Sequence, residues 1–530
     1  MHMSTGTQTW SPRPSYFELT GDDLIDAMTT GYKWSYQSDY HVLYFSVSSG
    51  FNGEYWTNPA AVRDGVAAIL NSFGEFANLR FNFNNFYPNP SAAAELSDIN
   101  ISLDGAGLAF NSSSVWARAF FPAPTYENSP YSGAAGDVFV NLNSQAVSLP
   151  SYGPGSQGWF LFMHELGHSL GLKHPHDDGG TGRPTFSAVG EAALDKDWFT
   201  IMSYNDDAQW NLFNWDPATP MAGDVIALQY LYGKNMNTKS GDTTIAIAEN
   251  GTYRSIWDAS GVDTIDLSTA HSGWVVLMPN SAISSLVDSK VGAAGLLSEF
   301  DSDTPTEVVW LIGDYENLTG SRYGDLLTGN LFNNRIKGSG GNDSVDGGDG
   351  CDLCVFTGAR SQYQLNVQAG TVADTQANRD GTDTLSNVER LKFSDINLAF
   401  DTDKGQTAGS AYRIYKAAFD RAPDAGGLGF WIDAMDDGAL LLSVATGFIS
   451  SPEFQKLYGA NVSDRDYVTK LYNNVLDRNP DQGGYDFWLG ALANGATRED
   501  ILVNFSESKE NIANVANLIA NGIQYQEWVG

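Results

Sequence analysis

The sequence predicts a multidomain protein with an α+β region first, an all-β region second and an all-α region last. Three observations predict this order. Short apolar strands alternate with amphipathic helices up to about residue 235, a nine-residue glycine–aspartate repeat fills residues 320–355, and a helical repeat of 57 residues follows residue 405. Because 530 residues exceed what one hydrophobic core holds, several domains are expected.

The composition narrows the range of functions. The chain carries 63 Asp and Glu residues against 29 Lys and Arg, a formal charge of −34. Such a charge repels nucleic acids and anionic membranes, and it favours the binding of hard cations such as calcium. No apolar run reaches the ~18 residues of a membrane span, so none is expected. The first residues lack the basic and apolar parts of a secretory signal peptide, so the protein either stays inside the cell or leaves by a route that does not read the N-terminus.

The α+β region is expected to begin with an arm or propeptide over residues 1–30, followed by a folded domain over residues 31–235. Apolar side chains recur at helical spacing over residues 59–77, directly after the helix start signals Asn58 and Pro59. The strands expected around this helix lie within residues 41–48, 79–86, 99–103, 116–122 and 137–143.

Residues 164–174 read HELGHSLGLKH. On a helix, His164 and His168 share one face, so both imidazoles can point at one zinc ion, and Glu165 lies beside the open coordination position. His174 would be about 15 Å from His164 along a continued helix, so the helix must end before it. Gly171 tolerates the positive φ that such a break requires. The pattern predicts a zinc site with three histidine ligands and a glutamate base.

Together with TIMSYN at residues 200–205, this motif resembles the metzincin zinc endopeptidases, and Tyr204 points to the serralysin branch. Residues 31–34 and 221–233 resemble the start and the end of that catalytic domain. The resemblance implies peptide hydrolysis by zinc-activated water, with Glu165 as general base and acid. It also implies that Met202 forms the Met-turn below the metal and that Tyr204 ligates the resting zinc and then stabilises the oxyanion. The zinc ligands implied are His164, His168, His174 and Tyr204.

The same resemblance gives residues 116–122 a role in substrate binding. It implies that they form an edge strand to which an extended substrate adds as a further strand. An ordinary inner strand is the open alternative. The residues concerned are Ala117, Arg118, Ala119 and Phe120.

The all-β region is expected over residues 236–400. In each nine-residue unit a glycine comes first, Asp or Asn sixth and an apolar residue eighth. This pattern resembles the parallel β-roll of RTX proteins, in which one calcium ion bridges turn n and turn n+2. A solvated linker would not explain the regular apolar position. The first two units depart from the consensus, so two or three ions are expected. The ligands implied are Asp325, Asn334, Gly338, Gly340, Asp343, Gly347, Asp349 and Asp352, with Asp325 paired to Asp343 and Asn334 to Asp352.

The serralysin resemblance implies further structural calcium before the repeat. Loops at residues 239–243 and 257–263 would share one ion, and a neighbouring ion would lie beside them. Ser260 replaces the usual glycine, but a carbonyl ligand survives that change. The first ion would be held by Lys239, Gly241, Thr243, Asp258, Ser260 and Asp263, and the second by Gly261, Asp263, Asp314 and Glu316, with Asp314 serving through its carbonyl.

Cys351 and Cys354 are the only cysteines in the chain. Cys354 occupies a buried eighth position of the repeat and Cys351 a loop, so they should meet different environments. With no further ligands nearby, neither a zinc site nor a redox pair is expected.

The all-α region is expected over residues 405–530. Residues 415–431 match residues 472–488 at nine positions, and each copy reads as a helix, a Pro/Gly turn and a second helix. The copies resemble a domain family of secreted bacterial proteins that is catalogued without a function. Their aromatic residues favour a core over a sugar-binding platform, and contact with a glycan or a cell surface stays open. Arg421 and Arg478 are expected to pair with Asp420, with Asp477 or with turn carbonyls.

These features predict a secreted, calcium-dependent zinc endopeptidase, expected as a monomer, with one catalytic zinc ion and several structural calcium ions. RTX proteins leave the cell by type I secretion, which needs no N-terminal signal. The expected partners are protein or peptide substrates and that secretion machinery. The alternative is a calcium-dependent cell-surface or S-layer-associated binding protein with a vestigial protease domain, and the intact Glu165 argues against it. A cytosolic metalloenzyme would not explain the repeat.

Overall fold

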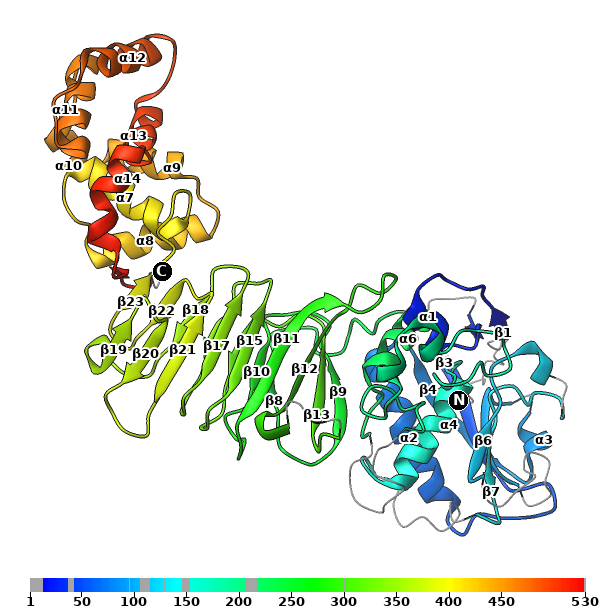
Figure 1. The fold of residues 1–530 in the computed structure, drawn as a ribbon. Helices are drawn as coiled ribbons and strands as arrows, with labels where there is room; N and C mark the ends of the chain where they lie inside the picture. Colours follow the sequence, from blue (N-terminus) through cyan, green and yellow to red (C-terminus); the bar gives the residue numbers. More distant parts are fainter. Residues whose placement is uncertain are drawn as a thin grey trace, which may run out of the picture. The chain divides into compact units, whose positions relative to one another are not determined.

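The computed structural model describes residues 13–36, 42–94, 96–104, 115–127, 130–144, 153–205, 217–299, 302 and 304–528. The chain is multidomain, with many strands and a C-terminal helical region (Figure 1). It divides into two compact units, Met1–Asn317 and Leu318–Gly530. Among the described residues, no helix combines the length and the apolar character needed to cross a membrane.

The first unit contains a five-stranded sheet in the order β4-β3-β5-β7-β6. Its first four strands are parallel, and β6 is antiparallel to β7 at the edge of the sheet. The strands expected from the sequence are therefore present. Their bounds are β3 (Val42–Ser48), β4 (Arg80–Tyr87), β5 (Ile99–Asp104), β6 (Ala117–Ala119) and β7 (Val138–Asn141).

Helices pack against this sheet and share its core. The helix expected after Asn58 is α2 (Pro59–Phe76), and the Asn58 side chain accepts the Ala61 N–H at 3.2 Å. Apolar residues of α2, α4 (Gln157–Ser169) and α6 (Ala222–Tyr232) form one buried cluster with the strands. Shorter helices are α1 (Asp23–Met28), α3 (Pro90–Ala93), α5 (Phe186–Val189), η1 (Pro124–Tyr126) and η3 (Ala192–Leu194).

Part of the segment expected as an N-terminal arm lies inside this core. Ile25 and Met28 of α1 are fully buried in the same cluster as the sheet. The Asp22 side chain caps α1 and accepts hydrogen bonds from Ser284 and Ser285. On either side of α1, β1 (Arg13–Tyr16) pairs antiparallel with β2 (Tyr32–Ser35).

The rest of the first unit is β structure that packs on the same core. Strands β11, β12 and β13 are antiparallel neighbours, and β13 pairs parallel with β9. Tyr253, Trp257 and Ile312 belong to the core cluster of the helices and sheet described above. The elements are β8 (Thr244–Ala246), β9 (Tyr253–Trp257), β10 (Thr264–Asp266), β11 (Trp274–Ala282), β12 (Lys290–Leu296), η4 (Leu297–Glu299) and β13 (Val308–Ile312), with β14 (Asn317–Thr319) at the unit boundary.

The second unit begins with the nine-residue repeat. Successive repeat strands alternate between two sheets, so β15 pairs parallel with β17, and β16 with β18. The apolar eighth residues are buried, as expected: Leu327, Ile336, Val345 and Cys354. The elements are β15 (Leu326–Asn330), β16 (Arg335–Lys337), β17 (Ser344–Gly348), β18 (Leu353–Val355), η5 (Arg360–Gln362), β19 (Tyr363–Asn366), β20 (Thr371–Asp374), β21 (Thr382–Ser386), β22 (Arg390–Lys392) and β23 (Asn397–Ala399).

The helical region consists of two copies of four helices each. Every helix of the second copy begins 57 residues after its counterpart, which is the period expected from the sequence, but each copy contains four helices where the sequence indicated two. Copy 1 is α7 (Thr407–Phe419), α8 (Ala425–Asp436), α9 (Leu441–Ser450) and α10 (Pro452–Tyr458). Copy 2 is α11 (Asp464–Leu476), α12 (Gln482–Ala493), α13 (Arg498–Ser506) and α14 (Lys509–Ile519).

The chain then returns to the sheet, where β24 (Ile523–Tyr525) pairs antiparallel with β23. The expected partners of the two repeated arginines are partly wrong. Arg421 pairs with Glu453, and Arg478 with Glu510, because α10 and α14 each present a glutamate in their first turn. The turn carbonyls are also bonded, as expected.

Candidate active site

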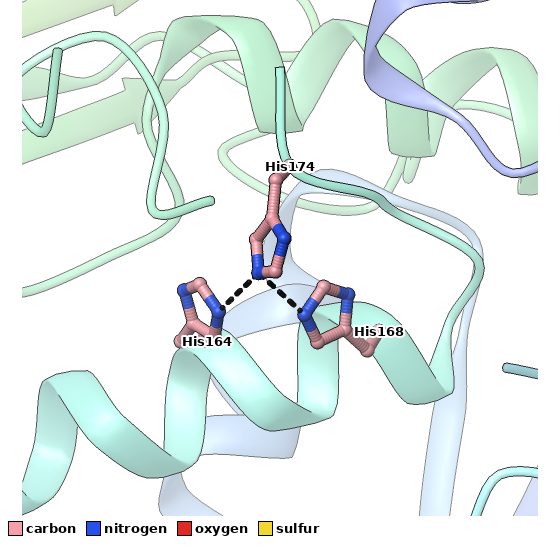
Figure 2. Close-up of side chains that lie close together, drawn as sticks. All are labelled: His164, His168 and His174. Carbon is pink, nitrogen blue, oxygen red and sulfur yellow. Dashed lines mark hydrogen bonds between the residues drawn. The ribbon is translucent and has the colours of Figure 1, made fainter. Parts of the chain in front are cut away.

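Three histidines converge at the end of α4. His164 and His168, both buried, each place Nε2 at 3.1 Å from Nε2 of His174 (Figure 2). The chain turns back after the helix at Gly171, whose φ is 100°. A Cβ at Gly171 would lie 2.3 Å from the Tyr32 carbonyl oxygen, so this position requires glycine for both conformation and space.

The outer nitrogen of each imidazole is held by an oxygen. His164 Nδ1 donates to the Ile201 carbonyl at 2.8 Å, and His168 Nδ1 to the Leu172 carbonyl at 2.9 Å. His174 Nδ1 donates to Asp177 Oδ2 at 2.8 Å. These acceptors fix the tautomers, so all three Nε2 lone pairs face one point. Three converging lone pairs repel one another unless a cation lies between them, and the donor set fits zinc.

The protonation states agree with metal binding. Burial, with repulsion from neighbouring imidazoles as the next cause, lowers the pKa of His164 and of His168 to about 3. The same causes lower the pKa of His174 to about 4. All three rings are therefore neutral at physiological pH, which is the ligating form.

Glu165 lies on the same helix, buried beside the histidines. Burial raises the pKa of its carboxyl to about 8, against the opposing effects of the Ala119 N–H and the Arg118 charge. Within the described part of the chain, Oε2 of Glu165 is buried without a hydrogen-bond partner. A carboxylate oxygen in this position can accept a proton from a water or a substrate group.

Tyr204 covers the histidine cluster from the solvent side. Its ring centre lies 4.5 Å from that of His174 and 5.3 Å from that of His164. Burial and the nearby Glu165 charge raise the pKa of its hydroxyl above the ordinary value, so the hydroxyl is a hydrogen-bond donor at neutral pH. More than half of Tyr204 is still exposed, so a substrate can reach it.

Met202 lies fully buried below the site. A Cβ on Gly167 of α4 would be 2.8 Å from Met202 Sδ, so the helix rests directly on this side chain. The turn around Met202 is held by a residue that sequence reasoning missed. The buried Asp224 carboxylate accepts hydrogen bonds from Thr200 Oγ1 and from the Ile201 and Met221 N–H groups at 2.7–2.8 Å.

The strand expected to bind substrate lies beside Glu165. Ala117, Arg118 and Ala119 form β6, the edge strand of the sheet, and Phe120 follows with its N–H bonded to the Asp137 carbonyl. The backbone N–H of Ala119 bonds to Glu165. An edge strand can pair with a further strand, and β6 lies beside α4, the helix that carries His164 and His168.

In the first unit, most of the residues expected to bind calcium before the repeat lie close together. Thr243 bonds to both Asp258 and Asp263, and the Asp263 N–H bonds to Glu316. Burial and the Asp263 charge raise the pKa of Asp258 to about 7. A Cβ on Gly261 would lie 2.7 Å from the Gly241 carbonyl oxygen, so the two loops touch. The Asp314 carboxylate pairs with Lys290 through Oδ1 at 2.8 Å.

In the repeat, hydrogen bonds form a ladder that joins residues of alternate turns, the same residues that were predicted to share calcium ions. The Asp325 N–H bonds to Asp343 Oδ1 at 2.9 Å, and the Asn334 N–H to Asp352 Oδ1 at 2.7 Å. The other oxygens, Oδ2 of Asp343 and of Asp352, are buried and have no partner among the described residues. Burial and nearby carboxylates raise the pKa of Asp343 to about 8 and of Asp352 to about 7. A calcium ion would satisfy both.

The ladder of hydrogen bonds from backbone N–H groups to carboxylates continues beyond the repeat. Its two further acids were not predicted from the sequence. The Asp343 N–H bonds to Asp383 Oδ1 at 3.0 Å, and the Asp352 N–H to Glu389 Oε2 at 2.9 Å. Burial raises the pKa of Asp383 to about 7. Both acids follow an insertion that contains β19 and β20, so no nine-residue period connects them to the motif.

Comparison with known proteins gives two results. Residues 445–515 match the family described as "Domain of unknown function (DUF4214)". Serralysin B of Dickeya chrysanthemi is 29% identical over 244 residues, which is 42% of this chain and 46% of the relative. Serralysin G of the same organism is 29% identical over 302 residues, 54% of this chain and 57% of the relative.

Metalloprotease AprA of Pseudomonas entomophila is 28% identical over 227 residues, 38% of this chain and 43% of the relative. The chain thus spans about half the length of the curated relatives it matches. These similarities confirm the resemblance to serralysins and AprA-type metalloproteases that the histidine motif and Tyr204 indicate.

Proposed function

We propose that this chain is a secreted, calcium-dependent zinc endopeptidase of the serralysin type. One observation carries the proposal: three Nε2 atoms converge within hydrogen-bond distance, beside a buried glutamate with a free oxygen. The relatives named serralysin and metalloprotease support it.

The proposed mechanism assigns a task to each side chain. A bound zinc ion would lower the pKa of a coordinated water and polarise the scissile carbonyl. His164, His168 and His174 would hold the ion, and their Nδ1 partners keep the rings in place. Glu165 Oε2 would take a proton from the attacking water and deliver it to the leaving amine nitrogen. The Tyr204 hydroxyl donates a hydrogen bond to the oxygen that becomes negatively charged.

The substrate is positioned by backbone groups. A peptide would add to β6 as a further antiparallel strand, which brings its scissile bond next to Glu165 because Ala119 is bonded to that glutamate. This mode of binding favours extended protein or peptide substrates over compact folded ones.

Calcium is proposed to stabilise the β structure. The candidate ligands are those predicted from the sequence, extended by Asp383 and Glu389, which repeat the same hydrogen-bond geometry. The strands of the repeat would then form a β-roll. In calcium-poor cytosol the buried carboxylates repel one another, so the region would fold after export through a type I secretion system.

The division into residues 1–30, 31–235, 236–400 and 405–530 is kept as a proposed functional division, with the second segment as catalytic domain. A monomer is proposed. The rival function is a cell-surface binding protein with a vestigial protease domain, and the intact geometry around Glu165 favours the enzyme.

Casein digestion by the full chain tests the proposal. Glu165→Ala removes the base and is expected to lower the rate by about 10²–10⁴-fold while the zinc content stays the same. Glu191→Ala, at an exposed glutamate, is the matched control and should keep full activity. Treatment with 1,10-phenanthroline should abolish activity, and added zinc should restore it. Undiminished digestion by Glu165→Ala would end the proposal.

A further inference from the structure

Copy 1 of the helical region contains an aromatic pocket of about 600 Å³. This volume lies in the range of about 300–1,000 Å³ that is typical of small-molecule sites. Its walls come from α7, α8, the α9–α10 junction and the segment after β24. The residues that carry the argument are Tyr415, Phe430, Trp431, Phe448, Glu453 and Trp528.

The aromatic rings of the pocket are partly accessible. Phe430 is 38% exposed and Trp528 is 48% exposed, and their rings meet edge to face at 5.2 Å. Trp431 packs edge to face on Phe448 at 5.0 Å. The chain's last described segment is held here, because the Gln526 N–H bonds to the Ala425 carbonyl. Trp528 is thereby fixed as one wall.

One side of the pocket is polar. Glu453 lines it and accepts two hydrogen bonds from Arg421, at 2.8 and 3.2 Å. The Tyr415 hydroxyl donates to Asp424 and accepts from Arg421. A carboxylate can accept about four hydrogen bonds, so Glu453 keeps acceptor capacity beyond Arg421. The wall thus offers donors and acceptors side by side while the charges of Arg421 and Glu453 compensate each other.

Copy 2 shows what builds this pocket. Gly447 of copy 1 corresponds to Asn504 of copy 2. A Cβ on Gly447 would lie 2.8 Å from Cη2 of Trp431, so only glycine leaves room for the indole across α9. In copy 2 the corresponding Trp488 tilts at 41° to Phe505, where the matching rings of copy 1 stand at 85°.

The polar groups differ in the same way. In copy 2 the Tyr472 hydroxyl takes a hydrogen bond from the Trp488 side chain. Phe487 of copy 2 corresponds to Phe430, but it is 65% exposed and the segment after β24 packs on copy 1 instead. Copy 1 therefore differs from copy 2 in having a tryptophan turned by a glycine and a second tryptophan from a distant segment, while the Arg–Glu pair occurs in both copies.

We propose that the copy 1 pocket binds a pyranose unit of a saccharide. A pyranose ring presents C–H groups on its faces, which gain dispersion energy against aromatic rings, and hydroxyls around its edge. The edge hydroxyls match the carboxylate of Glu453 and the hydroxyl of Tyr415, which line the pocket. A cationic ligand would meet a carboxylate that Arg421 already neutralises, and a purely apolar ligand would leave these groups unsatisfied.

The test uses the full chain carrying Glu165→Ala, so that the binding result does not depend on proteolysis. Cellotetraose, maltotetraose and chitotetraose are titrated separately, with calorimetry and tryptophan fluorescence as readouts. At least one is expected to bind with a dissociation constant below about 10 mM. Gly447→Asn should weaken that binding at least about tenfold, because the indole must leave the pocket.

Matched variants exist in copy 2. Asn504→Gly and Phe487→Ala should leave binding unchanged, while Phe430→Ala and Trp528→Ala should weaken it. Circular dichroism shows whether the Gly447→Asn variant still folds. If it does not fold, the binding measured with Trp528→Ala decides the test. The proposal is overturned if none of the three saccharides binds, if Gly447→Asn or Trp528→Ala binds as tightly as the parent, or if the Phe487→Ala change alone weakens binding.

Discussion

At the scale of single residues, the candidate zinc site depends on groups that do not touch the metal position. Each histidine is oriented through Nδ1, and two of the acceptors are main-chain carbonyls that substitution cannot remove. The third is the Asp177 carboxylate. Of the three acceptors that orient the histidine rings, Asp177 is therefore the one that a point mutation can remove.

We expect Asp177→Ala to weaken zinc binding by about 10–100-fold, because His174 loses the acceptor that fixes its ring. Competition with a chromophoric chelator measures the affinity directly. Asp178→Ala is the control. Asp177 and Asp178 each accept an N–H from the same loop, at Gly179 and Gly180, but only Asp177 bonds to the histidine. Equal losses in both variants would mean that loop structure, and not the contact with His174, matters.

The convergence of the three histidines could be predicted because their spacing is local. His164, His168 and His174 lie within eleven residues, and the break at Gly171 follows from helix geometry alone. Asp224 and Asp177 could not be recognised in the same way. Asp224 reaches the Met-turn from a later helix, and an aspartate three residues after a histidine is too common a pattern to single out.

At the scale of elements, the calcium ladder crosses from the repeat into strands outside it. The register of β17 with β21 and of β18 with β22 places Asp383 and Glu389 where another repeat turn would be. A period in the sequence cannot show this, because the intervening residues form β19 and β20. The repeat could be predicted from the sequence, but its extension to Asp383 and Glu389 could be recognised only from the pairing of the strands.

Asp383→Asn tests this extension. The asparagine can still accept the Asp343 N–H, so the change removes charge and keeps the hydrogen bond. We expect calcium titration calorimetry to show one site lost or weakened about tenfold, since calcium affinity depends on the number of charged ligands. Asp395→Asn, which keeps a turn contact with Arg360 outside the ladder, should retain all sites.

A half-buried carboxyl between β3 and β5 predicts a pH effect on the first unit. Asp98 accepts the Tyr44 N–H at 2.7 Å, and burial raises its pKa to about 7. With a raised pKa the folded state keeps the proton that the unfolded chain has lost. Stability is therefore full at low pH and falls by about 1.4 kcal/mol per pH unit between the ordinary carboxyl value and about 7.

Asp98→Asn keeps the acceptor and removes the charge. Thermal melts at constant calcium should show the variant more stable than the parent near pH 8, with the difference shrinking towards about pH 5. Asp64→Asn, an exposed position on α2, should show the same difference at both pH values. A variant that is less stable at pH 8 would contradict the raised pKa.

In the helical repeat, the sequence pattern predicts only the first half of each copy. The first two helices of each copy were predictable because they share Tyr, Asp, Arg, Pro, Gly and Trp at fixed positions. The third and fourth helices share few residues. Their equivalence becomes visible through the repeated ion pairs, Arg421 with Glu453 and Arg478 with Glu510, which have the same separation along the chain.

At the scale of the whole molecule, we expect the formal charge of −34 to make the stability of the folded chain depend on bound calcium. Buried carboxylates in both units have raised pKa values because burial disfavours their charged form and neighbouring carboxylates add to the effect. A chain with so many repelling acids gains stability from each divalent ion bound to the native state.

We expect calcium removal, with zinc kept in the buffer, to raise amide hydrogen exchange in β15–β18 and to lower the melting temperature. Calcium should reverse both effects and magnesium should not, because the loops offer more ligands than magnesium accepts. Copy 2, which contains no predicted calcium ligand, serves as the internal control. Equal amide hydrogen exchange in β15–β18 with and without calcium would contradict a structural role of calcium.

Contacts within the first unit join segments that are far apart in sequence. Asp22 bonds to Ser284 and Ser285, Gln229 to Ser289, and the Trp310 side chain to the Trp198 carbonyl. The strands after residue 235 are therefore part of the support of the helices that carry the histidines.

The contacts of Asp224 also set the order of events when the protein is made. The ring of His164 is held by the Ile201 carbonyl, and Ile201 is held in turn by the Asp224 carboxylate. Synthesis runs from the N-terminus to the C-terminus, so all three histidines emerge before Asp224. A nascent chain that ends before Asp224 carries the three histidines but lacks the carboxylate that holds Ile201, so the support of the His164 ring is complete only after α6 has been made.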